Sequence, residues 1–438
     1  MTRPFRFLIL VLVLAVSFVH PGIAWAGPPP AYFVDTTKLP FDALPGTTTT
    51  RFFGVHDGAG YRVEVPQDWN GELVLYAHGF RGTGLELTVT NPSIRAYLVT
   101  HGFAWAASSY SKNGYDVKQG VKDTHALGEL FNGLVGKPKR TYITGHSMGG
   151  HITGVANEQY PNDYAGALPM CGVMGDIKLF DYFLDYSLVA QALAGIQAQF
   201  PAPPDYLTTV VPAVKAALGP SFPSMLNAKG QELKAMTKFD TGGERPVFDV
   251  GWLVWNSPAL QNGNFLFGLG AGDGTVGVAP GSVVGNVDTV YQLDGDPAIS
   301  PEEQALNDSV LRVAPTPQGL QPNGLANIPP ILGTSRVPVI SLHTLGDLFV
   351  PFSMEQIYAR RMAANGDSGL LVERAIRDAG HCGFTVSEQE TAFADLVRWV
   401  EQGVKPAGDD ILDPAVVAAP RFGCNFTPVM HPLVPPCQ

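Results

Sequence analysis

The sequence has 438 residues, of which 45% are hydrophobic and 15% are charged, and its formal net charge is −11 at pH 7. This acidic balance excludes nucleic acid as the expected partner, because phosphate binding requires clustered lysine and arginine side chains. The apolar content excludes extensive disorder and is enough for one large elaborated domain or two smaller ones.

The N-terminal segment has the features of a signal peptide. Two arginines precede an apolar run over residues 7–19, and the small residues Ala24 and Ala26 follow it. The run is shorter than the roughly 20 residues that a membrane-spanning helix needs, and the small residues are typical of a signal-peptidase site. We therefore expect residues 1–26 to be removed and the mature protein to be secreted, extracellular or periplasmic, with no membrane span.

After this segment, short apolar runs rich in β-branched residues alternate with helical patterns. The alternation predicts an α/β protein with a mostly parallel central sheet flanked by helices. The expected strands cover residues 61–65, 72–77, 103–108, 141–144, 165–170, 337–342 and 371–376. Two capping-box spacings, Ser353 with Gln356 and Ser387 with Glu390, predict helix starts, and Gly403 predicts the end of the second helix.

The same alternation divides the mature chain into four segments. Residues 27–176 and 336–403 are expected to form the two parts of the core, and residues 404–438 a proline-rich C-terminal arm. Residues 177–335 do not show the alternation of strands and helices and are rich in Pro, Gly and Ala. We therefore expect an inserted cap or lid that begins with a helix over 186–198. Insertions of this size are uncommon without a function.

Aromatic residues within the expected cap predict the kind of group it binds. Trp252, Trp255, Phe265 and Phe267 lie in this segment. We therefore expect the substrate to carry an apolar or aromatic acyl or alcohol group.

The strongest chemical signal is Gly145-His146-Ser147-Met148-Gly149, between the expected strand 141–144 and a helical stretch. In a Gly-x-Ser-x-Gly elbow, a tight strand-to-helix turn lifts the serine hydroxyl clear of the sheet, and only very small residues fit two positions before and after it. The start of the helix also directs unpaired N–H groups toward a developing oxyanion. The pattern predicts that Ser147 is a nucleophile.

A second oxyanion donor is expected in the loop after the neighbouring strand. The apolar strand 72–77 leads directly into His78-Gly79-Phe80. We predict that the backbone N–H groups of Phe80 and Met148 form the oxyanion hole, with Arg81 as an alternative to Phe80. His78 is expected to be a structural hydrogen-bonding residue in this loop.

In proteins with this elbow the acid follows the serine, and the histidine follows the acid. Only His381 and His431 come after the last expected strand, and His431 lies among prolines of the arm. We therefore predict His381, on a glycine-flanked loop, as the general base. Asp347, which follows the strand 337–342, is the predicted acid, and Asp176, after the strand 165–170, is the alternative.

The four cysteines are an even number in a chain expected to be exported, which favours two disulfides. We expect Cys424 to pair with Cys437, because both lie in the arm. Cys171 ends the strand beside the nucleophile strand and Cys382 follows His381, so a bond between them would hold the histidine loop over Ser147. The alternative for Cys171 is a buried apolar thiol. The chain has no Cys-x-x-Cys or His-Glu-x-x-His pattern, so we expect no metal and no cofactor.

Together with Asp68-Trp69-Asn70-Gly71 and Gly380-His381-Cys382-Gly383-Phe384, these motifs resemble those of a secreted bacterial carboxylesterase of the α/β-hydrolase superfamily. The resemblance covers the catalytic core, a little over half of the chain. It implies an α/β-hydrolase fold and a small-molecule or polymeric ester as substrate. The His-Cys step is similar to feruloyl esterase and tannase sequences, in which a cysteine beside the serine bonds one beside the histidine. Here His146 precedes Ser147.

The triad is compatible with three reactions of an acyl-enzyme, because fold does not fix chemistry. We expect carboxylic ester hydrolysis; the alternatives are a secreted peptidase or aminopeptidase and an acyltransferase. An aminopeptidase needs cap carboxylates to bind an ammonium group, and Glu244 or Asp249 are the candidates. An intact triad argues against a binding protein without catalysis.

Overall fold

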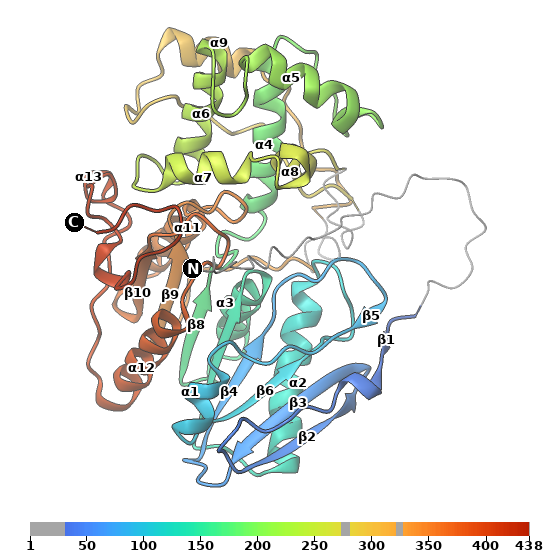
Figure 1. Ribbon diagram of the computed structural model, residues 1–438, viewed down its shortest axis with the longest axis vertical. Helices are drawn as coiled ribbons and strands as arrows, with labels where there is room; N and C mark the ends of the chain where they lie inside the picture. The colour runs from blue at the N-terminus through green and yellow to red at the C-terminus, as the bar shows by residue number, and fades with distance from the viewer. Residues whose placement is uncertain (1–30, 273–280, 321–326, 438) are drawn as a thin grey trace, which may run out of the picture.

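An eight-stranded sheet forms the centre of the protein (Figure 1). The computed structural model describes residues 31–272, 281–320 and 327–437, so the expected signal peptide lies outside the described residues. The strands of this sheet are β2 (Thr49–His56), β3 (Ala59–Pro66), β4 (Glu72–Ala77), β6 (Ala104–Ser108), β7 (Arg140–His146), β8 (Gly166–Met170), β9 (Val339–Thr344) and β10 (Leu371–Ile376). A separate short parallel pair joins β1 (Phe33–Val34) to β5 (Glu86–Leu87).

The strand order across the large sheet is β10-β9-β8-β7-β4-β6-β3-β2. β3 pairs antiparallel with both β2 and β6, and the other neighbouring strands are parallel. An antiparallel start followed by parallel strands, with β6 placed before β4, is the α/β-hydrolase fold, which confirms the predicted fold class. All seven expected strands are present, with each end within two residues of the prediction. β2 was not predicted, because it is a half-exposed edge strand with few of the apolar residues that mark a buried one.

Helices cover both faces of the sheet. They are α1 (Arg95–Thr100), α2 (Val117–Leu134), α3 (Met148–Gln159), α11 (Ser353–Ala364) and α12 (Val386–Gln402). Because successive side chains of a strand point to opposite faces, Leu73 and Leu75 of β4 pack with α2 and α3, while Val74 packs with α1 and α12. Among the described residues, no helix has the length and apolarity needed to cross a membrane.

Between β8 and β9 the described chain forms helices, which lie above the carboxyl ends of the strands in Figure 1. The α-helices described there are α4 (Lys178–Leu193), α5 (Val211–Leu218), α6 (Ala228–Asp240), α7 (Phe248–Trp255), α8 (Phe265–Leu269) and α9 (Pro301–Ser309). The expected helix over 186–198 is wrong in its bounds, since α4 begins at Lys178. This helix is buried on nearly all sides, so its start carries no amphipathic pattern.

Short helical turns complete the structure. They are η1 (Thr36–Lys38), η2 (Tyr206–Val210), η3 (Gln261–Gly263), η4 (Ser368–Leu370), α13 (Pro414–Val417) and η5 (Cys424–Phe426).

The two predicted capping boxes are wrong, although both helices exist. α11 begins at Ser353 itself and has no side-chain cap. α12 begins two residues earlier than predicted, because the extended backbone of Thr385 lets its hydroxyl accept from the N–H of Glu388 in a capping box of its own. Gly403 ends α12 in a left-handed conformation with φ of 70°, as predicted.

The C-terminal arm runs beside the edge strand β10. The N–H of Ala375 donates to Asp409 Oδ2 at 2.9 Å, and the N–H of Arg377 donates to Thr427 Oγ1 at 2.9 Å. The guanidinium of Arg374 lies 4.5 Å from the ring centre of Phe426. The arm therefore supplies partners to an edge strand that would otherwise expose unpaired backbone groups.

One buried carboxylate is expected to contribute strongly to folding. Glu64 is fully buried and accepts hydrogen bonds from Arg95 Nε at 2.7 Å and Trp105 Nε1 at 2.7 Å. Replacing Glu64 by Ala should lower the free energy of unfolding by about 3 kcal/mol, because it leaves a mostly buried guanidinium unpaired. Urea unfolding measures this change. Glu86→Ala, which removes the exposed pair with Lys38, should change it little, and equal effects of both substitutions would contradict the assignment.

Candidate active site

Ser147 lies at a strained turn between β7 and α3. Its backbone has φ of 59° and ψ of −123°, which a non-glycine residue rarely adopts. A side chain at Gly145 would overlap the carbonyl of Gly149, and one at Gly149 would overlap the carbonyl of Ala77. The glycines on both sides of the serine are therefore required by close packing of backbone on backbone, as expected for a nucleophile elbow.

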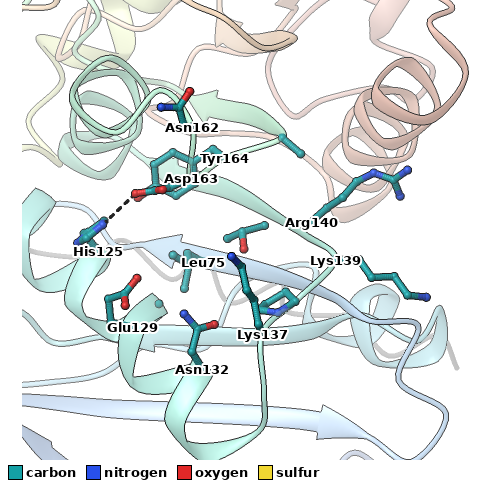
Figure 2. Close-up of a pocket in the computed structure, with 14 residues that line it drawn as sticks. Leu75, His125, Glu129, Asn132, Lys137, Lys139, Arg140, Asn162, Asp163 and Tyr164 are labelled. Carbon is teal, nitrogen blue, oxygen red and sulfur yellow. Dashed lines mark hydrogen bonds and ion pairs between the residues drawn. The ribbon is translucent and has the colours of Figure 1, made fainter.

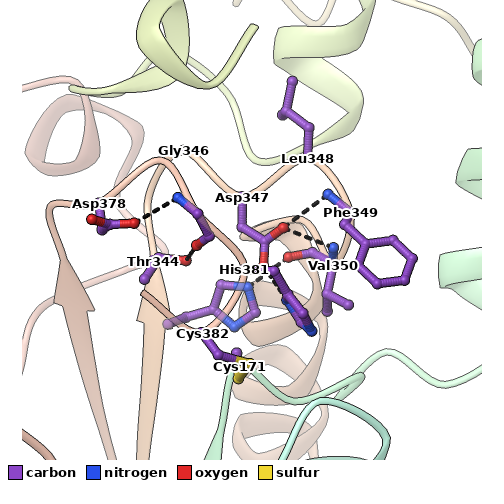
Figure 3. A network of polar contacts seen from close by, with 12 residues as sticks. Cys171, Thr344, Gly346, Asp347, Leu348, Phe349, Val350, Asp378, His381 and Cys382 are labelled. Atoms are coloured by element: carbon purple, nitrogen blue, oxygen red, sulfur yellow. Dashed lines mark hydrogen bonds and ion pairs between the residues drawn. A yellow bond between two sulfur atoms is a disulfide. The ribbon is translucent and has the colours of Figure 1, made fainter. Parts of the chain in front are cut away.

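Asp347 and His381 are in direct contact (Figure 3). His381 Nδ1 donates to Asp347 Oδ2 at 2.6 Å, and Asp347 Oδ1 accepts from the N–H groups of Phe349 at 2.8 Å and Val350 at 3.0 Å. The aspartate is fully buried, and the turn after β9 supplies two of its three donors. This arrangement fixes the ring orientation and directs Nε2 away from the carboxylate.

The loops that carry these two residues are bound to each other. Thr344 Oγ1 donates to the carbonyl of Gly380 at 2.8 Å, and the N–H of Gly346 donates to the carbonyl of Asp378 at 2.9 Å. From helix α7 above, Trp255 Nε1 lies 3.1 Å from the carbonyl of Gly346 and 2.8 Å from that of Ala379. One indole thus joins the acid loop, the histidine loop and the helical region between β8 and β9.

A disulfide connects the histidine loop to the neighbourhood of Ser147. Cys171 is bonded to Cys382, and the second expected disulfide, Cys424–Cys437, is also present. Cys171 follows Met170, whose carbonyl accepts from the N–H of Ser147 at 3.0 Å. A ring nitrogen of His381 and the two sulfurs of the first bond lie within 4.8 Å of one another. Since these sulfurs are bonded together, they offer no thiolate ligands to a metal.

The third contact of the expected triad is not formed. Within the described residues, His381 Nε2 is buried and has no hydrogen-bond partner, so the hydroxyl of Ser147 does not bond to it. Catalytic hydrogen bonds are often long in structures without substrate and tighten when one binds. The structure therefore joins Asp347 to His381, and it connects their loop to the serine through Met170 and the disulfide.

The loop after β4 lies against the serine. A Cβ atom built on Gly79 would be 3.1 Å from Ser147 Cβ and 3.6 Å from its Oγ. Phe80 is the next residue, and Met148 is the first residue of α3, so its N–H has no acceptor within the helix. Arg81 extends its guanidinium to Thr88 Oγ1 at 3.2 Å. The two predicted oxyanion donors thus belong to the two segments that border Ser147.

His78 is held by the backbone, as the sequence predicts. Its Nδ1 lies 2.6 Å from the carbonyl of Gly79, its Nε2 lies 3.2 Å from that of Ser109, and its ring stacks on Tyr110. Burial lowers the pKa of His78 to about 4, so the ring is neutral at physiological pH. It therefore shapes the loop before Phe80.

The alternative acid, Asp176, has other partners. Its Oδ2 accepts from Arg361 Nη1 at 2.6 Å and from the N–H of Ile331 at 3.1 Å. Arg361 belongs to α11 and Ile331 to the segment before β9, and the carboxylate is buried beside them. The structure thus brings Asp347, and not Asp176, to the histidine.

The two carboxylates considered for binding an ammonium group are on the surface. Glu244 pairs with Lys238 Nζ at 2.6 Å, and Asp249 pairs with Lys234 Nζ at 2.7 Å. Both acidic side chains are more than half exposed, so neither is aimed into an enclosed site.

Phe349 is an aromatic neighbour of the histidine that was not predicted from the sequence. Its ring lies edge-on to His381 with centroids 5.1 Å apart, and it also contacts Phe183, Trp255 and Phe265 with centroid separations of 6.0, 6.0 and 5.2 Å. The sequence feature that could have indicated its place in the site is its position two residues after the predicted acid, Asp347. Of the four aromatics expected to bind substrate, Trp252 and Phe267 are fully buried within the helical region, whereas Trp255 and Phe265 belong to this cluster.

His146, the residue before Ser147, has a hydrogen-bonding partner at each ring nitrogen. Its Nδ1 lies 3.2 Å from the hydroxyl of Tyr76, and its Nε2 lies 3.1 Å from Gln389 Oε1 of α12. Burial lowers the pKa of His146 to about 4, so this ring is also neutral. The elbow and α12 are therefore joined by a neutral histidine.

A separate cavity lies at the amino end of β7, away from the carboxyl ends of the strands. Figure 2 shows this cavity of about 360 Å³, lined by polar residues that include His125, Lys139 and Asp163. It opens where β7 begins, at Arg140, whereas Ser147 follows the carboxyl end of the same strand. Ligands of such sheets bind at the carboxyl ends, so this hollow is not the candidate active site.

The strand order and the elbow define a protein of the α/β-hydrolase fold, and no protein-family model matches the chain. By sequence it is similar to the o-phthalyl amidase of Xanthobacter agilis, with 22% identity over 401 residues that cover 80% of this chain and 87% of the amidase. Among solved structures it is similar to feruloyl esterase B from Aspergillus oryzae, with a TM-score of 0.48, 14% identity and 86% of each chain covered.

The chain is also similar to the tannin acyl hydrolase from Aspergillus niger. This likeness has a TM-score of 0.48 and 15% identity, and it covers 82% of this chain and 79% of the other. Both structural likenesses concern the fold, which the strand order already defines.

The two disulfides should contribute unequally to stability. Cys171 and Cys382 are 211 residues apart in sequence, and Cys424 and Cys437 are 13 apart. In the chain-entropy model, a bond that closes the longer loop restricts the unfolded chain more. Replacing both cysteines of a pair by serine should therefore cost about 5 kcal/mol for the first bond and about 3 kcal/mol for the second. Urea unfolding measures both, and a larger loss for the arm disulfide would contradict this ranking.

Proposed function

We propose that the protein is a secreted serine hydrolase that cleaves carboxylic esters through a Ser147–His381–Asp347 triad. The observation that carries the proposal is the 2.6 Å contact between His381 Nδ1 and Asp347 Oδ2, with Nε2 of the same ring left without a hydrogen-bond partner among the described residues. A buried aspartate that orients a histidine whose second nitrogen is free is the arrangement that general-base activation of a serine requires.

In the proposed reaction, His381 Nε2 accepts the hydroxyl proton of Ser147 as Oγ attacks the ester carbonyl. The N–H groups of Phe80 and Met148 stabilise the oxyanion. The protonated histidine then gives its proton to the leaving alcohol, and the acyl group remains on the serine. Water, deprotonated by the same nitrogen, attacks the acyl-enzyme and releases the carboxylic acid.

Amide hydrolysis is the second candidate, and the similarity to an o-phthalyl amidase favours it specifically. The steps are the same, except that an amine leaves in place of the alcohol. A peptidase that recognises a free N-terminus is less favoured, because Glu244 and Asp249 are exposed and already paired with lysines. Secretion is supported by the two disulfides, which persist in oxidising compartments.

The triad makes a direct prediction. Ser147→Ala should abolish both hydrolysis of p-nitrophenyl esters and labelling by a fluorophosphonate probe, because the attacking oxygen is gone. Asp347→Asn should lower kcat by about 10⁴-fold, since the amide selects the wrong tautomer of His381. Asp176→Asn, the matched control, should retain the chemistry. Labelling that persists in the serine variant would remove Ser147 from its proposed role.

The aromatic cluster supports an aromatic acyl group in the substrate. Phe349 contacts the ring of His381 and is partly exposed, and Trp255 and Phe265 extend the same apolar wall. Aromatic rings pack edge-to-face on such walls, and each pair contributes about 0.5–1.5 kcal/mol beyond burial. We therefore propose that the acyl group lies against Phe349.

This choice of substrate is testable with a matched pair of esters. Phe349→Ala should lower kcat/KM for a benzoyl ester about tenfold while changing that for an acetyl ester of the same alcohol much less, because only the aryl acyl group loses its packing surface. Phe53→Ala on the exposed edge strand β2 serves as the control. Equal losses on both esters would place the acyl group elsewhere.

A further inference from the structure

His431, the second late histidine of the sequence, is buried between two carboxylates. Its Nδ1 lies 2.9 Å from Asp378 Oδ2 and its Nε2 lies 2.9 Å from Glu388 Oε1, and all three residues are buried. A neutral imidazole has one N–H, so it would turn a lone pair toward one of these carboxylates. Only the imidazolium form donates to both.

The two carboxylates bound by His431 also bind the loop that carries His381. Asp378 Oδ1 accepts from the N–H of Gly380 at 2.6 Å, one residue before the histidine. Glu388 Oε2 accepts from the N–H of Thr385 at 2.8 Å, at the start of α12. Each acid therefore uses one oxygen on the loop and the other on His431, so the imidazolium ties together both ends of the segment 378–388.

We propose that His431, as an imidazolium, is a positioning residue that clamps the His381 loop in its catalytic position. The proposal rests on the function proposed above, because it concerns the orientation of that histidine. The clamp comes from the C-terminal arm, which the Cys424–Cys437 disulfide closes on itself. The arm would thereby help to position the catalytic histidine, in addition to pairing with the edge strand β10.

The surroundings of His431 contain one further charged side chain, among the described residues that line the small cavity beside it. This cavity of about 140 Å³ is lined by His431, Arg377 and uncharged residues of the arm. Arg377 Nη1 donates to the carbonyls of Pro420 at 2.8 Å and Phe422 at 3.0 Å. The guanidinium is thus bound to backbone, and Asp378 and Glu388 are the acids that decide the protonation of the imidazole.

The clamp makes the stability of the loop depend on pH. Hydrogen bonds to Asp378 and Glu388 raise the pKa of His431 to about 9 in the folded protein, compared with about 6.5 for a free histidine. Because the folded state holds this proton more tightly, the contribution to stability is complete below about pH 6.5 and is lost as the pH rises through about 9. Catalysis that depends on the clamp should decline over the same upper range.

The test measures kcat, KM and thermal unfolding between pH 6 and pH 10, with a p-nitrophenyl ester as substrate. It uses the wild-type protein, three variants of the clamp and one control variant. His431→Gln removes the charge and should lower kcat about tenfold or more at pH 7 with little change in KM. His431→Lys keeps a cation and should restore much of kcat and move the alkaline decline to higher pH. Glu388→Gln removes one of the two acids and should move it to lower pH.

The matched control is His125→Gln, which removes a histidine–aspartate pair of 3.0 Å with Asp163 in the distant hollow of Figure 2. It should leave the pH profile unchanged. A folded His431→Gln protein with the kcat and alkaline decline of the original would overturn the clamp.

A wild-type protein without hydrolase activity would instead overturn the proposed function. The clamp would still be tested by unfolding in that case. The unfolding midpoint should fall between pH 7 and pH 9.5 more steeply in wild type than in His431→Gln, and parallel curves would overturn the clamp.

Discussion

The hydrogen bond between His381 Nδ1 and Asp347 Oδ2 is the contact around which the rest of the site is arranged. It joins the loops after β9 and β10, which are neighbours in the sheet, at the edge where β7 delivers Ser147. Without it, the imidazole would be free to rotate and would have no fixed tautomer. The parallel sheet makes the contact possible, since it brings the carboxyl ends of β7, β9 and β10 to one side.

Several separate bonds hold that loop, and each comes from a different part of the chain. The disulfide Cys171–Cys382 attaches it to the end of β8, Trp255 attaches it to helix α7, and His431 attaches it to the C-terminal arm. Cys171 follows β8, the strand next to β7, and His146 occupies the position before the serine. The disulfide therefore restrains the His381 loop from the end of β8, while the neutral ring of His146 hydrogen-bonds the elbow to its neighbours.

The fold and much of the site follow from local sequence patterns. The elbow can be predicted because backbone contacts forbid any side chain at the glycines around Ser147. The buried strands can be predicted because parallel strands are continuously apolar. The features that the sequence does not reveal depend on contacts between distant segments. β2 is half exposed, α4 is apolar on all sides, and Thr385 caps α12 only because the preceding loop leaves it extended. Phe349 and His431 gain their roles from partners elsewhere in the chain.

The central claim is that the hydroxyl of Ser147 meets the free nitrogen of His381. A crystal structure of the protein after reaction with a phosphonate ester measures this most directly, because the adduct mimics the tetrahedral intermediate. We expect phosphorus bonded to Ser147 Oγ, His381 Nε2 within about 3.2 Å of that oxygen, and a phosphoryl oxygen about 2.7–3.1 Å from the N–H groups of Met148 and Phe80. An adduct on Ser147 with the imidazole turned away, or no adduct there, would contradict it.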